Sequence, residues 1–135
     1  MAFRVLIVDD SATTRKIVRR TLELARVPLA DVGEAPDGLA ALQLLRERRF
    51  DVVLADINMP QMNGMELIAA MSRDAQLATI PVIIVTTEGS LQRIHELHRM
   101  GAQGYIHKPF APEKIRDIFR GVMGDWDDEA DEGAA

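Results

Sequence analysis

The chain has 135 residues, no cysteine and a formal net charge of −5. This length predicts one domain with its own hydrophobic core, and the absence of cysteine excludes disulfides, thiolate metal sites and cysteine nucleophiles. Six of the 21 acidic residues lie in residues 125–135, which leaves 15 acids against 16 basic residues elsewhere. The body of the chain is therefore nearly neutral, and we expect no nucleic-acid binding through a broad basic surface.

No segment has the pattern of a membrane helix or a signal peptide. The first apolar run, Val5 to Val8, is far shorter than either and ends in two aspartates. We therefore expect a cytoplasmic protein without membrane insertion. Residues 1–124 are expected to fold, and residues 125–135 to form a disordered acidic tail, because the acids repel one another and only Trp126 offers much surface to bury. Docking of Trp126 on the final helix is the alternative for that residue.

The chain begins with a predicted strand and helix. Phe3 to Val8 is a short apolar strand, and Asp10 or Ser11 can cap a helix that begins near Ala12. Apolar residues recur in this helix at the spacing of an inward face: Ile17, Val18, Leu22 and Ala25. The basic residues fall mostly on the opposite side and predict a solvated face: Arg15, Lys16, Arg19 and Arg20.

The next segments repeat this alternation. Residues 31–35 predict a weak strand near the edge of a sheet, and residues 36–38 a turn into a helix whose inward residues are Leu39, Leu42 and Leu45. Residues 52–55 are entirely apolar, which predicts a strand covered on both faces. This strand runs into Asp56, and Pro60 ends it. A third helix is marked by Met65, Ile68 and Met71.

The last part contains two further strand and helix pairs. Residues 80–85 predict a buried strand, and Thr86 to Gly89 a loop before a helix with an apolar stripe of Leu91, Ile94 and Leu97 that Gly101 ends. Residues 103–107 predict a fifth strand, and residues 112–123 a final helix. Five alternating strand and helix pairs with short connections predict a doubly wound α/β fold with a five-stranded parallel sheet.

Polar residues follow four of the predicted strands: Asp9, Asp10, Asp56, Thr86 and Lys108. In a parallel sheet these strand ends share one edge, which is where open α/β sheets bind ligands. Three carboxylates close together repel one another, and a divalent cation together with Lys108 balances their charge. Oxygen ligands without histidine or sulfur favour Mg²⁺, with Mn²⁺ possible, over zinc.

Asp56 lies centrally among these residues, on the third strand, which makes it the candidate nucleophile. An aspartyl phosphate is the natural covalent product of such a carboxylate beside a metal. The Lys108 ammonium and the Thr86 hydroxyl could bind oxygens of the phosphoryl group.

Four groups of residues resemble the receiver domain of two-component response regulators: Asp9-Asp10, Asp56 to Pro60 with Gly64, Thr86-Thr87, and Tyr105 to Phe110. The resemblance covers about residues 3–122 and is greatest to single-domain chemotaxis regulators of the CheY type. It implies a flavodoxin-like sheet with strand order 2-1-3-4-5. It also implies that Asp56 accepts a phosphoryl group from a histidine kinase or a small phosphodonor.

The same resemblance implies a role for each site residue. Asp9, Asp10, Asp56 and the Asn58 carbonyl would hold Mg²⁺, Thr86 and Lys108 would bind the phosphoryl group, and the Lys108–Pro109 peptide would be cis. Tyr105 would move inward with Thr86 and change the surface of the fourth helix, fifth strand and fifth helix.

Two flanking positions are implied to tune the lifetime of the phosphoryl group, namely Asn58 and Glu88. Both are of the chemotaxis type, which predicts a short lifetime. Thr87 departs from the small residue common in the family, and its bulk could slow access to the phosphate.

The expected partners are a histidine kinase or histidine phosphotransfer domain and a downstream protein such as a flagellar motor component. The protein itself is expected to be a monomer. A phosphate sink or phosphorelay intermediate is the alternative. A Mg²⁺-dependent aspartyl phosphatase is disfavoured because Asn58 replaces the expected acid and no cap insertion is present. A phosphorylation-independent scaffold is disfavoured by the full set of site residues, and a flavodoxin by the acids after the first strand.

Overall fold

The computed structural model describes residues 2–87 and 89–126. Its sheet has five parallel strands in the order β2-β1-β3-β4-β5, which confirms the predicted fold class. The strands are β1 (Phe3–Val8), β2 (Leu29–Ala35), β3 (Val52–Ala55), β4 (Val82–Thr86) and β5 (Gly104–His107). β2 lies at an edge of the sheet, as predicted from its weak pattern.

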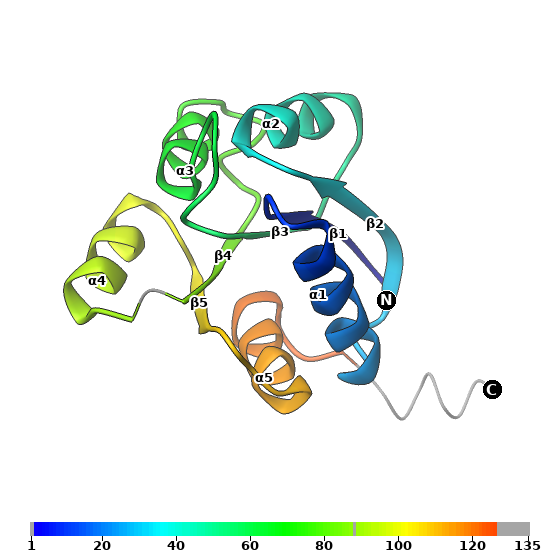
Figure 1. Cartoon of the computed structure of the whole chain (residues 1–135). Helices are drawn as coiled ribbons and strands as arrows, with labels where there is room; N and C mark the ends of the chain where they lie inside the picture. Colours follow the sequence, from blue (N-terminus) through cyan, green and yellow to red (C-terminus); the bar gives the residue numbers. More distant parts are fainter. Residues whose placement is uncertain (1, 88, 127–135) are drawn as a thin grey trace.

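Helices cover both faces of the sheet (Figure 1). They are α1 (Ala12–Leu24), α2 (Gly38–Glu47), α3 (Gly64–Ser72), α4 (Leu91–Met100) and α5 (Pro112–Met123). One core forms between the sheet and α2, α3 and α4, and a second forms between the sheet and α1 and α5. The all-apolar pattern of β3 is explained by this arrangement, because both of its faces are covered and each of its residues is buried.

Four of the helices begin with a side-chain cap at the same edge of the sheet. The capping residues, whose side chains accept a hydrogen bond from a backbone N–H in the first turn, are Ser11, Asp37, Asn63 and Ser90. Asn63 also forms a capping box with Glu66. These caps fix where each loop turns from a strand end into its helix, and so they shape the edge on which the candidate site lies.

Three inward positions predicted from helical spacing are wrong. Ile17, Leu39 and Leu91 have exposed fractions of 58%, 51% and 75%, whereas other apolar residues of the same helices are buried. Each helix contacts the sheet through a narrow stripe, so residues at the margin of the apolar face remain in solvent. Thr86 also differs from its predicted loop position, because it is the last residue of β4 and is fully buried.

Trp126 belongs to the second core although it follows the last helix. Its side chain is 5% exposed and lies edge-on to Phe3, with ring centroids 6.0 Å apart. The guanidinium of Arg120 lies over the indole ring, 4.9 Å from its centroid. The boundary predicted at residue 124 therefore lies inside a packed segment, while residues 127–135 lie outside the described part of the chain.

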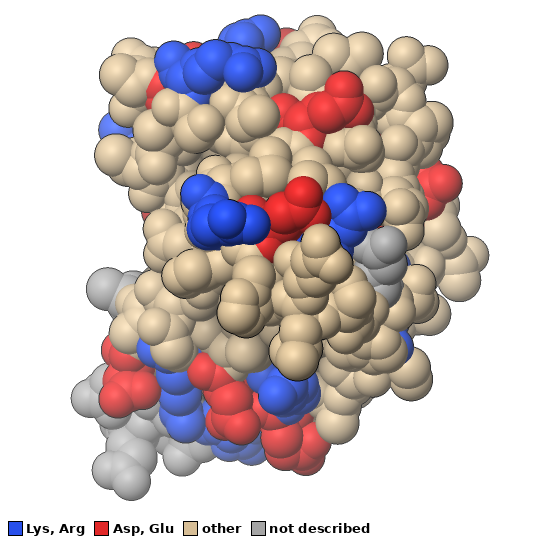
Figure 2. All heavy atoms as spheres, turned by 90° about the vertical axis from the view of Figure 1, so that its left-hand side faces the viewer, with Lys and Arg blue, Asp and Glu red and all other residues tan. Residues whose placement is uncertain are grey.

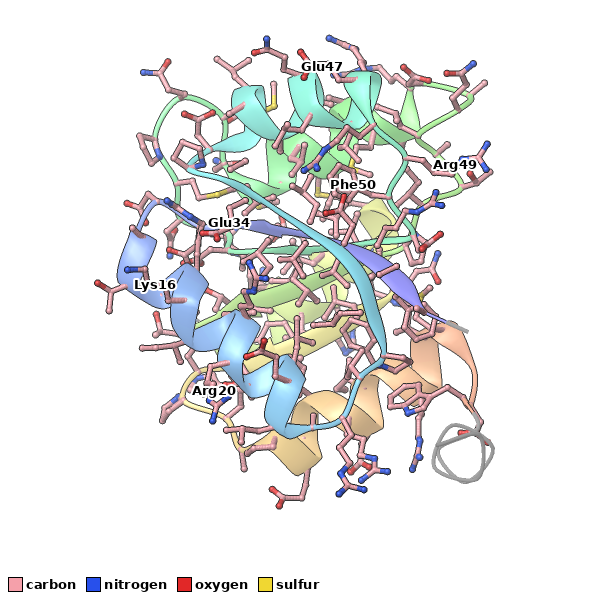
Figure 3. All side chains as sticks on the ribbon, turned by 90° about the vertical axis from the view of Figure 1, so that its right-hand side faces the viewer. Lys16, Arg20, Glu34, Glu47, Arg49 and Phe50 are labelled. Atoms are coloured by element: carbon pink, nitrogen blue, oxygen red, sulfur yellow. The ribbon has the colours of Figure 1, made fainter. Side chains whose placement is uncertain are left out.

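A groove lies at the edge of the sheet where the strands β3 and β4 begin. This groove has a volume of about 600 Å³ and lies between the end of α2 and the segment before β4. Arg49 and Phe50 mark this edge in Figure 3, across the sheet from Glu34. Among the helices that the structure describes, none has the length and hydrophobicity to cross a bilayer.

Candidate functional site

Sheet topology brings Asp9, Asp56 and Lys108 to one edge. Asp9 and Asp56 directly follow the neighbouring strands β1 and β3, and Lys108 follows β5. The backbone N–H of each donates to a carbonyl of an adjacent strand: Asp9 to Ala35 at 3.0 Å, Asp56 to Val8 at 3.0 Å, and Lys108 to Thr86 at 2.8 Å. The positions of the three side chains are therefore set by strand pairing rather than by loose loops.

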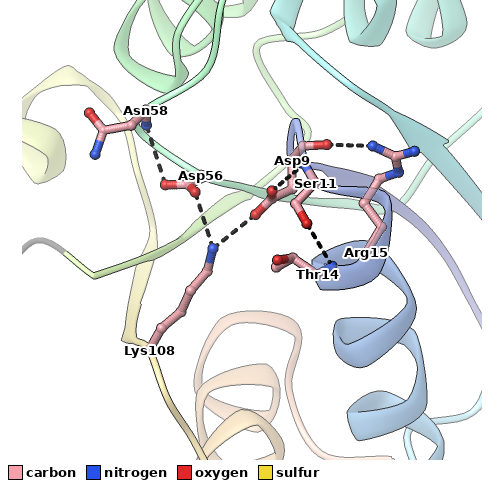
Figure 4. Close-up of polar contacts among 7 residues, drawn as sticks. All are labelled: Asp9, Ser11, Thr14, Arg15, Asp56, Asn58 and Lys108. Carbon is pink, nitrogen blue, oxygen red and sulfur yellow. Dashed lines mark hydrogen bonds and ion pairs between the residues drawn. The ribbon is translucent and has the colours of Figure 1, made fainter.

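The Lys108 ammonium joins the two carboxylates (Figure 4). Its Nζ donates to Asp9 Oδ2 at 2.8 Å and to Asp56 Oδ2 at 3.1 Å, and all three side chains are at most 18% exposed. Burial alone lowers the pKa of Lys108, but hydrogen bonds and attraction from both aspartates outweigh it and raise that pKa from its ordinary value of 10.5. Lys108 is therefore a permanent cation at neutral pH.

Asp56 is positioned by the loop that follows β3. Its Oδ1 accepts a hydrogen bond from the Asn58 backbone N–H at 3.3 Å, and its Oδ2 is held by Lys108. Gly64, the first residue of α3, lies so close that an added Cβ would overlap the Asp56 carbonyl oxygen. This close approach requires a glycine, and it places the start of α3 directly beneath the candidate nucleophile.

The described residues contain no preassembled group of three His, Cys, Asp or Glu side chains that could hold a metal. Asp9 and Asp56 lie together, but the Asp10 side chain is exposed. The ligand chemistry still fits a hard divalent cation, because the site offers carboxylate oxygens without histidine or sulfur. The Lys108 ammonium already bridges two of these carboxylates. Asp9, Asp10 and Asp56 are the residues that could bind such an ion.

Thr86 and Tyr105 link this edge to the α4 side of the sheet. Thr86 ends β4, and its carbonyl receives the Lys108 N–H. Tyr105 pairs with Ile84 across β4 and β5, and its side chain packs against the core under α2, α3 and α4. The tyrosine hydroxyl is buried. The Lys108–Pro109 peptide that follows β5 is cis.

A groove of about 650 Å³ lies between α4 and β5. Tyr105, Leu97 and the exposed residues His95 and His98 are among its lining residues. Figure 2 shows the side of the molecule that carries α3 and α4, where charged side chains form small separate groups on a largely uncharged surface.

Arg15 is a site residue that the sequence pattern missed. Its side chain was expected on a solvated helix face, but it is 16% exposed and lies beside Asp9. The available indication was its place in the first turn of α1, where the helix dipole disfavours a cation. Glu88, predicted to tune the phosphoryl lifetime, lies outside the described residues, whereas Thr87 is described and exposed.

Comparison with known proteins identifies the fold and the family. The model of the response regulator receiver domain matches residues 5–120. The chemotaxis protein CheY of Pseudomonas aeruginosa is 38% identical over 125 residues, which cover 90% of this chain and 99% of that protein. A CheY homolog of Campylobacter jejuni is 37% identical over 90% of this chain and 92% of its own.

A solved structure supports the same assignment. The chemotaxis response regulator CheY4 of Vibrio cholerae superposes with a TM-score of 0.80 at 37% identity, over 90% of this chain and 99% of that one. The family match spans most of the chain, and it includes Asp9, Asp56 and Lys108 at the edge described above. The chain therefore belongs to the response regulator receiver domain family and is a signalling protein of the CheY type.

Proposed function

We propose that Asp56 accepts a phosphoryl group in a Mg²⁺-dependent reaction and that this controls the binding of a partner protein. The donor is a histidine kinase or histidine phosphotransfer domain, the protein acts in the cytoplasm, and the setting is chemotaxis or motility signalling. The main support is the Lys108 ammonium, which lies within 3.1 Å of both Asp9 and Asp56. A buried carboxylate held beside a fixed cation is arranged to receive a group rich in negative charge.

In the proposed reaction an Asp56 carboxylate oxygen forms a bond to phosphorus as the bond from phosphorus to the donor nitrogen breaks. Lys108 pairs with the new negative charge, and the Thr86 hydroxyl binds a second phosphoryl oxygen. When bound, Mg²⁺ would neutralise further charge, held by Asp9, Asp10 and Asp56 with the Asn58 carbonyl. Asn58 and Glu88 position the water that later removes the phosphoryl group.

The proposed output surface comprises α4, β5 and α5. Transfer of Lys108 from Asp9 and Asp56 to a phosphoryl group changes the contacts at the end of β5, where the Lys108 N–H is bonded to the Thr86 carbonyl. Tyr105 lies on the same strand and lines the groove against α4. Two alternative packings of Thr86 and Tyr105 would therefore present two different surfaces to a partner.

Labelling with acetyl phosphate and Mg²⁺, followed by intact mass measurement, tests the central step. The wild type should gain one phosphoryl group, and Asp56→Asn should gain none. Asp51→Asn is the matched control, because Asp51 lies just before the same strand at its other end and binds the Arg4 N–H at 2.7 Å. An unmodified wild type, or equal labelling of Asp56→Asn, would contradict the proposal.

A second experiment separates an output module from a phosphate sink. The protein is used as bait with and without beryllofluoride, which mimics the phosphoryl group, and bound proteins are identified by mass spectrometry. Output function predicts a partner that binds only in the presence of the mimic and is lost with a charged substitution at exposed Leu91. Binding that is confined to the kinase would favour the sink.

A further inference from the structure

Arg15 makes two contacts that connect the loop after β1, which carries Asp9 and Asp10, to the neighbouring strand β2. Its Nη1 donates to the Asp9 carbonyl oxygen at 2.6 Å, and its Nε donates to Glu34 Oε1 at 2.9 Å. The Asp9 contact is visible in Figure 4, and Glu34 lies near the end of β2 in Figure 3. The guanidinium is thus held between the loop after β1 and the adjacent edge strand.

The contact to Asp9 completes the set of partners around this residue. The other three partners are Ala35 for its backbone N–H, Ser11 N–H for Oδ1 at 2.9 Å, and Lys108 for Oδ2. The carbonyl that Arg15 holds belongs to the peptide joining Asp9 to Asp10. Because this peptide is planar, fixing its oxygen also fixes the direction in which Asp10 leaves the loop.

Stabilisation of α1 does not account for the conformation of the Arg15 side chain. A cation near the start of a helix is opposed by the helix dipole, and a salt bridge at the surface contributes about 0–1 kcal/mol. Lys16, Arg19 and Arg20 on the same helix are exposed, as Figure 3 shows for Lys16 and Arg20. Arg15 instead folds back toward the loop and is only 16% exposed.

Glu34 makes the arrangement compatible with a nearby metal ion. An unpaired guanidinium beside Asp9 would repel a divalent cation, whereas the ion pair with Glu34 cancels the positive charge and leaves the hydrogen bond to the carbonyl. The planar guanidinium can donate in two directions at once from a fixed geometry.

We propose that Arg15 is a positioning residue that, together with Glu34, orients the Asp9–Asp10 peptide for binding of the divalent cation. This inference rests on the proposed function of the site. Replacement of residues that hydrogen-bond to metal ligands and orient them typically weakens metal affinity 10- to 100-fold. We therefore expect Arg15→Met to raise the Mg²⁺ dissociation constant about tenfold.

Mg²⁺ binding is measured by calorimetric titration of the unphosphorylated protein without any phosphodonor. Arg19→Met is the matched control, because Arg19 is an exposed arginine on the same helix. Glu34→Gln should also weaken binding, since it leaves the Arg15 charge unbalanced. Arg15→Lys keeps the charge but cannot reproduce both contacts, so its affinity should lie between wild type and Arg15→Met.

Two further readouts distinguish positioning from general destabilisation. In Arg15→Met, saturating Mg²⁺ should restore the rate of acetyl phosphate labelling to near the wild-type value. In the metal-free variant, hydrogen exchange of the Ser11 amide should be faster, because its acceptor on Asp9 is less firmly held. Arg15→Lys retains a full-length cationic side chain and provides the same comparisons if Arg15→Met folds poorly.

The inference is overturned if Arg15→Met and Arg19→Met bind Mg²⁺ equally, or if the labelling rate of Arg15→Met stays low at saturating Mg²⁺. Either result would leave the proposed function intact as long as the wild type is labelled on Asp56. A wild type that binds no Mg²⁺ and is not labelled would overturn both.

Discussion

Replacement of Lys108 by methionine removes the positive charge between two buried carboxylates and keeps a side chain of similar length. The two contacts, at 2.8 and 3.1 Å, place the Asp9 and Asp56 oxygens at most about 6 Å apart. At an effective dielectric of 20, two unit charges at this separation repel by about 3 kcal/mol. We therefore expect Lys108→Met to lower the free energy of unfolding by about 3 kcal/mol at neutral pH.

Urea unfolding at neutral pH measures this loss, with Lys114→Met as the control, because Lys114 is exposed on α5. With a slope of about 1–3 kcal/mol per molar urea, the midpoint of Lys108→Met should fall by about 1–3 M. Addition of Mg²⁺ should recover part of the loss, because the ion supplies the missing positive charge and binds only the folded protein. Equal midpoints for the two variants, or no recovery with Mg²⁺, would refute this reasoning.

Three further predictions follow from the same contacts. Gly64→Ala should lower the free energy of unfolding by about 1–3 kcal/mol and reduce acetyl phosphate labelling, because the added Cβ would displace the Asp56 backbone. Thermal unfolding measures the lost stability. Gly121→Ala is the control and should not destabilise, because nothing lies within 4 Å of its added Cβ. Trp126→Ala should lower the free energy of unfolding in urea by about 3 kcal/mol. Trp126→Phe should lower it much less, because phenylalanine keeps a buried ring and the indole N–H that it removes has no hydrogen-bond partner among the described residues. Because folding raises the pKa of Lys108 above its ordinary value of 10.5, the charged lysine contributes its full stabilisation of the folded protein below pH 10.5. This stabilisation is lost as pH rises through the pKa of Lys108 in the folded protein. The difference in unfolding free energy between wild type and Lys108→Met should therefore narrow only above pH 10.5.

The parallel sheet and the site edge were predictable because they depend on features that a sequence displays directly, whereas the strand order was implied by the resemblance to receiver domains. Asp56 after a fully apolar strand and Lys108 after the fifth strand lie on the same edge if the sheet is parallel, and the long lysine side chain spans the intervening strand β4. Asp9 lies on the same edge, because it follows β1, which is apolar except for Arg4. Helix margins were less predictable, because spacing alone does not tell how wide a contact stripe is, as exposed Ile17 and Leu39 demonstrate.

Arg15 and Trp126 illustrate the interactions that local patterns miss. The guanidinium of Arg15 crosses from a helix to a loop and a neighbouring strand, so its partners depend on tertiary structure. Trp126 is surrounded by acids in the sequence, which favoured a solvated tail, yet its ring has an apolar partner in Phe3 at the other end of the chain. Charge composition alone therefore misrepresented the tryptophan, whose side chain is buried.

The contact between Trp126 and Phe3 affects the order in which the domain can be completed. Phe3 begins β1, whereas its aromatic partners Phe119 and Trp126 lie in and after α5. Until these partners are in place, the α1 and α5 side of the core presents an open apolar surface around Phe3. A truncated chain that stops before Trp126 therefore leaves uncovered apolar surface around Phe3 and is expected to aggregate more readily than the complete domain.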